Sequence, residues 1–219
     1  MDVLIAIPIL IAIIPGFISL ILIAKTNSKL WIIALVGGGG WLIASILRLP
    51  ILNALRGIDS ELYILFAALL AGIFEETIRY LTTKKIIDVS NKRLAILNTL
   101  CLGLGWGLAE ALIVYVIQVP ISATILGYNW LAFLPGALER NIALLLHVVL
   151  SIIILYAVFS KVYFMIIAIT IHTIVNITAI FIASLFTNPW IVEAFIALVI
   201  MLITILVILY KPYFPESVT

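Results

Sequence analysis

The chain has 219 residues, a length that one soluble domain could have, but its composition excludes that class. Hydrophobic residues make up 66% of the sequence and charged residues 10%, whereas a typical soluble domain has about half and about a quarter. So few charges could not cover so much apolar surface. We therefore expect an integral, multi-pass membrane protein, most simply in the plasma membrane of a prokaryote.

Charge and cysteine content exclude further classes of protein. A net charge of +2 in so apolar a chain is too small for nucleic-acid binding as a main role. The one cysteine, Cys101, excludes a disulfide framework and a zinc site built from cysteines. The apolar start lacks the positive flank and the small-residue cleavage site of a signal peptide, so it is predicted to be a first spanning helix.

Seven apolar runs have the length of a membrane span, which needs about 20 residues. They cover roughly residues 3–24, 30–48, 62–83, 94–117, 134–159, 162–186 and 190–210. Polar turns are expected at 25–29 and 187–189, a turn at 160–161, and loops at 50–61, 84–93 and 120–135. Because water cannot satisfy the backbone at membrane depth, each span should be an α-helix. Residues 1–219 should form a single polytopic membrane domain.

The positive residues predict the orientation of the spans. With seven spans, one side of the membrane has eight positive residues: Lys25, Lys29, Lys84, Lys85, Lys92, Arg93, Lys161 and Lys211. Three lie on or near the other side: Arg48, Arg56 and Arg140. Cytosolic loops collect lysine and arginine. The amino terminus should therefore lie outside and the carboxyl terminus in the cytosol.

Ionisable residues inside the spans are the candidates for function, because each such charge costs some kcal/mol at membrane depth. Both histidines of the chain lie within apolar runs, His147 in the fifth and His172 in the sixth. The others are Glu75, Glu76 and Arg79 in the third, Glu110 in the fourth, Glu139 and Arg140 in the fifth, and Glu193 near the outer end of the seventh.

The third span carries a doubled glutamate followed by an arginine. Arg79 lies four residues after Glu75 and three after Glu76, so it shares a helix face with either carboxylate. One glutamate can then be held ionised while the other, turned about 100° away, points elsewhere. Two neighbouring carboxylates in apolar surroundings favour a general base, although a single Glu–Arg pair could equally lock two helices together.

The sixth span places His172 and Asn176 on one helix face, four residues apart. Both side chains can donate hydrogen bonds, as an oxyanion hole requires. A polar clasp between helices is the alternative for this pair. At 1.5 Å per residue, Glu76, His147 and His172 all lie near the midplane, whereas Glu110, about 25 Å from Arg93, is expected to be displaced outward.

These motifs resemble those of a known superfamily. Glu75-Glu76-Thr-Ile-Arg79, Trp106-Gly-Leu-Ala-Glu110, His147 and His172-Thr-Ile-Val-Asn176 follow the order of four motifs in the CAAX protease and bacteriocin-processing superfamily of intramembrane proteases. Two residues, rather than three, separate the glutamate pair from the arginine, and Glu110 stands where the CAAX enzymes have histidine. Both departures resemble the PrsW and YhfC types.

The resemblance implies a glutamate-dependent intramembrane endopeptidase, with spans three to six around a polar cavity. In this reading Glu75 or Glu76 activates a water, and Glu110 or His147 assists. Arg79 orients the glutamate pair. The substrate is expected to be a membrane protein or a membrane-associated peptide.

The resemblance also implies that His172 and Asn176 stabilise the oxyanion. We expect no cofactor, but metal involvement is open: if a Zn²⁺ takes part, Glu76, His147 and His172 are its candidate ligands, in the manner of a site with two histidines and a glutamate. No HExxH helix is present in the sequence.

Two other functions fit parts of the sequence. The chain also resembles the APH subunit of gamma-secretase around 74–85, 102–111, 145–147 and 172–190, which implies a non-catalytic scaffold. On that hypothesis Gly37–Gly40 would receive a partner helix, although the strip could instead serve internal packing. A proton-coupled transporter is disfavoured, because the spans show no duplicated halves.

Overall fold

The structure, a computed structural model, describes residues 3–88 and 90–210. These residues form helices joined by short turns, and no strand occurs among them. In chain order the elements are η1 (Val3–Ile5), α1 (Ala6–Ala24), α2 (Ser28–Ala54), α3 (Ser60–Ile86), α4 (Lys92–Glu110), η2 (Ala111–Ile117), α5 (Gln118–Leu126), η3 (Trp130–Phe133), α6 (Leu134–Phe159), α7 (Tyr163–Leu185) and α8 (Pro189–Leu209). The all-helical fold predicted from the apolar runs is confirmed.

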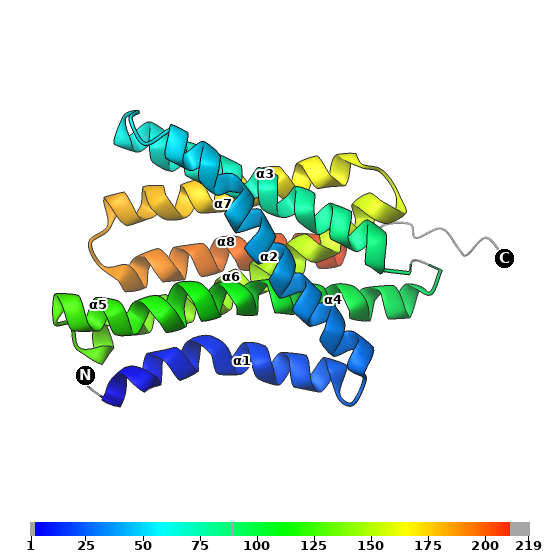
Figure 1. The fold of residues 1–219 in the computed structure, drawn as a ribbon, viewed down its shortest axis with the longest axis horizontal. Helices are drawn as coiled ribbons and strands as arrows, with labels where there is room; N and C mark the ends of the chain where they lie inside the picture. The colour runs from blue at the N-terminus through cyan, green and yellow to red at the C-terminus, as the bar shows by residue number, and fades with distance from the viewer. Residues whose placement is uncertain (1–2, 89, 211–219) are drawn as a thin grey trace.

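Six helical segments are long and apolar enough to cross a membrane: 3–24, 28–54, 92–126, 130–159, 163–185 and 189–209. Helix α3 is as long as α2, with 27 residues, but it includes Glu75, Glu76 and Arg79. These charges make α3 less apolar than its neighbours. It packs beside α2 and α7 (Figure 1).

Two of the expected loops are largely helical. Helix α2 continues to Ala54 with Pro50 inside it, so the break expected at Pro50 is wrong. The loop expected at 120–135 is also wrong, because a π-helical stretch, α5 and η3 occupy most of it. Proline often ends a helix, but it can lie inside a long membrane helix whose neighbouring turns stay hydrogen bonded.

The polar residues of the turns cap the helices that follow. Asn27, Asp59, Asn91 and Asn188 each accept a hydrogen bond from a backbone N–H in the first turn of α2, α3, α4 or α8. Such caps satisfy donors that the helix itself leaves unpaired. The turns around residues 160–162 and 186–188 lie where the sequence predicts them.

Helix α4 lies at the centre of the bundle and packs most heavily against α2 and α6. Its glycines allow both contacts. A Cβ at Gly103 or Gly107 would lie 2.8 or 2.9 Å from a backbone atom of α6. On the other face, a Cβ at Gly105 would lie 1.8 Å from the carbonyl oxygen of Ala34 in α2. The absent side chains therefore let three helix backbones meet in one layer.

The glycine strip of α2 faces α4. Hypothetical Cβ atoms at Gly37, Gly38 and Gly40 would lie 2.2 to 3.2 Å from atoms of α4, whereas nothing lies within 4 Å of one at Gly39. The strip is thus used for internal packing. It no longer supports a scaffold that receives a partner helix there.

This packing predicts an asymmetric effect of two alanine substitutions. Gly105→Ala should lower the free energy of unfolding by about 1–3 kcal/mol, because the added methyl group overlaps the backbone of α2. Gly39→Ala should leave it unchanged or slightly raised, since alanine is the better helix former and the site is open. Thermal unfolding of the two purified variants in detergent measures the difference. Equal destabilisation would contradict the close approach of α4 to α2.

Candidate active site

A polar cavity of about 180 Å³ lies inside the bundle. Five of the site residues predicted from the sequence line it: Glu75, Glu110, His147, His172 and Asn176. They come from α3, α4, α6 and α7, the four helices expected to hold the site. Asn176 lies one turn beyond His172 on α7 and is partly buried.

The two neighbouring glutamates of α3 turn to different partners. Glu76 forms an ion pair with Arg79, with 3.0 Å between Oε2 and Nε, and both side chains are fully buried. Glu75 instead faces the cavity, where its Oε2 accepts a hydrogen bond from Trp106 Nε1 at 3.0 Å. Its Oε1 lies 3.4 Å from Arg48 Nη1. The guanidinium of Arg79 therefore compensates one carboxylate, and the second is exposed to the cavity.

Arg79 also holds α3 against α6. Its Nη1 donates to the carbonyl oxygen of His147 at 2.8 Å and to Ser151 Oγ at 2.9 Å. Its Nη2 lies 3.0 Å from Nδ1 of the His147 ring, and its guanidinium carbon lies 4.2 Å from the centre of the Trp106 ring. An arginine cannot accept a hydrogen bond, so Nδ1 must be the acceptor and His147 carries its proton on Nε2.

That Nε2 proton points at Glu110. The distance from His147 Nε2 to Glu110 Oε2 is 2.6 Å, and Glu110 Oε1 accepts from Arg140 Nη1 at 2.7 Å. Arg140 in turn pairs with Glu139. Glu110 therefore joins the site from the side of His147 that faces Arg140 and Glu139. The outward displacement expected from the sequence does not keep it from reaching His147.

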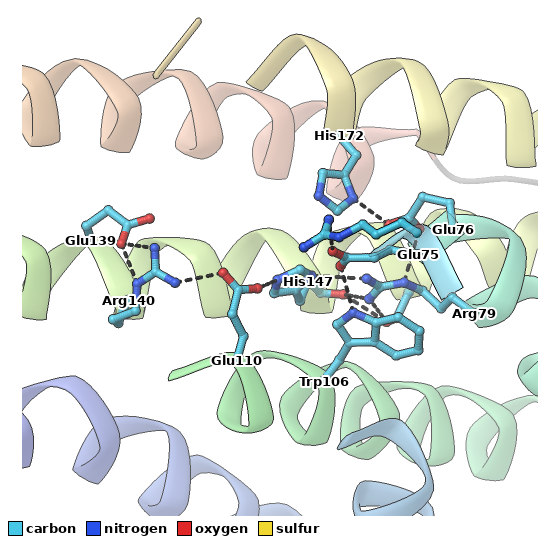
Figure 2. A network of polar contacts seen from close by, with 11 residues as sticks. Glu75, Glu76, Arg79, Trp106, Glu110, Glu139, Arg140, His147 and His172 are labelled. Carbon is cyan, nitrogen blue, oxygen red and sulfur yellow. Dashed lines mark hydrogen bonds and ion pairs between the residues drawn. The ribbon is translucent and has the colours of Figure 1, made fainter. Parts of the chain in front are cut away.

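His172 completes the constellation from α7. Its Nδ1 lies 2.8 Å from Glu76 Oε1, and its ring centre lies 5.8 Å from that of His147. The ionised Glu76 accepts at this contact, so Nδ1 carries a proton and Nε2 is left for another partner. Figure 2 shows the resulting row of contacts, which runs from Glu139 past His147 to His172.

Three side chains of the site are of the types that bind metal ions in proteins. One ligand atom each from Glu75, Glu110 and His147 lies within 4.8 Å of the other two. The set proposed from the sequence shares only His147 with this group. Both oxygens of Glu76 are taken by Arg79 and His172. Residue spacing could not reveal which glutamate of the pair faces the cavity.

Five further residues belong to the network and lie outside the predicted site, among them Trp106, which donates to Glu75, and Glu139, which pairs with Arg140. Arg48 contacts Glu75, Arg140 contacts Glu110, and Ser151 accepts from Arg79. The two arginines were visible in the sequence as charges in or beside predicted spans, where an unpaired charge is costly. Nothing in the sequence distinguished Ser151 from other serines.

Comparison with known protein families identifies a match that covers most of the chain. A family model described as YhfC intramembrane metalloprotease matches residues 10–129 and 120–196. Together these segments contain every residue of the site described above. No curated protein matches the chain.

Proposed function

Because the chain belongs to the YhfC intramembrane metalloprotease family, we propose that its polar cavity is the active site of an endopeptidase acting on membrane-associated polypeptides. The observation that carries the proposal is the meeting of Glu75, Glu110, His147 and His172, from four helices, around one cavity. Side chains that cost energy at membrane depth are rarely brought together without a chemical use.

The protein is an integral, multi-pass membrane protein. We propose that α3 is a seventh span beside the six apolar ones, because it has their length and its buried charges are paired inside the bundle. The lysine-rich turns favour a cytosolic position for the end of the bundle that holds them. The amino terminus would then lie outside.

Glu75 is the better candidate for the water-activating base. It lines the cavity, and its carboxylate is held only by Trp106 and a long contact to Arg48. Glu76 lies behind the cavity wall, where Arg79 and His172 occupy both of its oxygens. In this assignment Glu75 takes the proton from the attacking water, and Glu76 orients the ring of His172.

His172 and Asn176 are placed to stabilise the developing oxyanion. The Nδ1 proton of His172 is directed at Glu76, so the ring must donate through Nε2. That requires the imidazolium form, whose charge Glu76 can compensate. Asn176, one turn along α7, offers an amide donor on the same cavity wall. Donors that are already positioned need no reorganisation as charge develops.

The family name implies a metal, and the residues of the cavity fit one. Carboxylate and imidazole are ligand types that Zn²⁺ accepts, and one such atom each from Glu75, Glu110 and His147 lies within 4.8 Å of the other two. Glu110 and His147 would hold the metal, and Glu75 would lie beside it as the base. Arg140 holds Glu110 from behind, as outer partners commonly hold metal ligands. Metal binding at Nε2 of His147 would displace the proton that this nitrogen carries beside Glu110. The chemistry supplied by a bound Zn²⁺ is that of a Lewis acid toward the peptide carbonyl oxygen.

A reconstituted cleavage assay tests the proposed function. Purified protein in proteoliposomes should cleave members of a panel of membrane-associated peptides, and a chelator should abolish cleavage that added Zn²⁺ then restores. The same chelator saturated with Zn²⁺ is the control and should not inhibit. Elemental analysis of the protein before and after chelation gives a second readout. Cleavage that survives removal of all bound metal would contradict the metal site, and a protein that cleaves no peptide would contradict the proteolytic function.

A further inference from the structure

The cavity extends from the two histidines toward only one end of the bundle. On α6 its lining begins with Glu139, near the start of the helix, and ends at His147. On α7 it begins with His172 and ends at Ala179. Because α6 and α7 are joined by a short turn and run in opposite directions, both series lead from the histidines to the end where α6 begins (Figure 1).

Helices α2 and α3 point to the same end. The lining of α2 runs from Trp41 to Arg48, toward the end of that helix, and the lining of α3 consists of Ala71 and Glu75, on the side toward its start. These two helices are joined by the turn at residues 55–59. Figure 1 shows this turn at the same end of the bundle as α5 and the start of α6.

The exposure of the charged side chains decreases from the end of the bundle where α6 begins toward the histidines. The side chains of Glu139 and Arg48 are 29% and 23% exposed, whereas that of His172 is 5% exposed and that of Glu76 is 0% exposed. Beyond Glu76, Arg79 and its contacts to α6 form a fully buried layer. The cavity is therefore more exposed at the Glu139 end, and the Arg79 layer closes its other end.

The lysines lie at the opposite end. Six lysines lie in the described residues, and all of them are in or next to the turns that join α1 to α2, α3 to α4 and α6 to α7. They are Lys25, Lys29, Lys84, Lys85, Lys92 and Lys161. In Figure 1 these turns lie at the right of the bundle, away from the turn between α2 and α3. Positive residues of this kind mark the cytosolic side of a membrane protein.

We propose that the cavity opens to the extracytoplasmic side of the membrane. The substrate is then a membrane-anchored polypeptide whose cleaved bond lies at or outside the outer half of the bilayer, and an extended segment enters past Arg48 and Glu139. This proposal rests on the proposed function for the identity of the substrate, but the direction of opening rests on the cavity and the lysines alone.

Accessibility of single cysteines tests the direction without any need for cleavage. In a Cys101→Ser background, Val114→Cys and Ala179→Cys place reporters in the cavity wall. Lys29→Cys and Asn129→Cys place exposed markers at the lysine end and at the opposite end. Each variant is treated with a membrane-impermeant thiol reagent, in right-side-out and in inverted membrane vesicles.

The two cavity reporters should react in right-side-out vesicles, together with Asn129→Cys, and stay unlabelled in inverted vesicles. Thr83→Cys, in the buried layer beyond Glu76, should stay unlabelled in both. Reporters that react together with Lys29→Cys, or that react from neither side, would overturn the proposal. Labelling of Lys29→Cys from outside would overturn it as well. A chain that opens outward yet cleaves no peptide would contradict the proposed function and not the direction of opening.

Discussion

Replacing Glu75 with glutamine should reduce peptide cleavage by about 10²–10⁴-fold, the usual contribution of a general acid or base. Glutamine keeps a side-chain oxygen that can accept from Trp106 Nε1, but it cannot take a proton from water. The variant should therefore remain inserted and folded. Initial rates in proteoliposomes, normalised to folded protein, measure the effect.

Glu61→Gln is the matched control, because it makes the same chemical change at an exposed position in the first turn of the same helix. It should cleave at the wild-type rate. A Glu75→Gln variant that also cleaves at that rate would contradict the assignment of Glu75 as the base.

A Glu76→Gln substitution distinguishes the role of Glu76 from that of Glu75. It should also abolish cleavage, since His172 loses its orienting carboxylate. Unlike Glu75→Gln, it leaves the buried guanidinium of Arg79 without its ionised partner. Breaking such a buried pair typically costs about 3–5 kcal/mol, so this variant should unfold at a lower temperature. Equal thermal stability of the two variants would contradict the pairing of Arg79 with Glu76 rather than with Glu75.

Replacing His172 with alanine should lower kcat by about 10²–10³-fold, the usual effect of removing one oxyanion donor. KM should change little, because the interaction is made mainly in the transition state. The measurement is the dependence of initial rate on peptide concentration in proteoliposomes. A rise in KM with unchanged kcat would show that His172 binds substrate and does not stabilise the oxyanion.

Thr170→Ala provides the control on the same helix. Thr170 is exposed, and its hydroxyl donates to the carbonyl of Ile166 within α7. Its removal should leave both kinetic constants unchanged. If His172→Ala retained full cleavage together with Glu76→Gln, the assignment of this site to proteolysis would be refuted.

The contacts of the site explain how so many charges are tolerated inside an apolar bundle. Arg79 faces Glu76, and Arg140 faces both Glu110 and Glu139. Each charge is therefore compensated by a neighbour on the same or an adjacent helix. A buried network of this kind is stable when complete and costly when one member is removed.

Composition and residue spacing alone determined the class of this protein. The apolar runs predicted an all-helical membrane protein, because a backbone in lipid must satisfy its own hydrogen bonds. The few charges inside those runs predicted which helices carry the site, because such charges are expensive at that depth. Helix geometry also predicted that Arg79 could hold only one of the two adjacent glutamates.

Only the tertiary structure decided which residues meet. Glu110 reaches His147, and Arg48 and Arg140 join the cavity, because α4 packs closely against both α2 and α6. The end at which the cavity opens also depends on how the helices are arranged around it. Periodicity along a helix fixes its faces but carries no information on its depth, its tilt or the partners those faces meet.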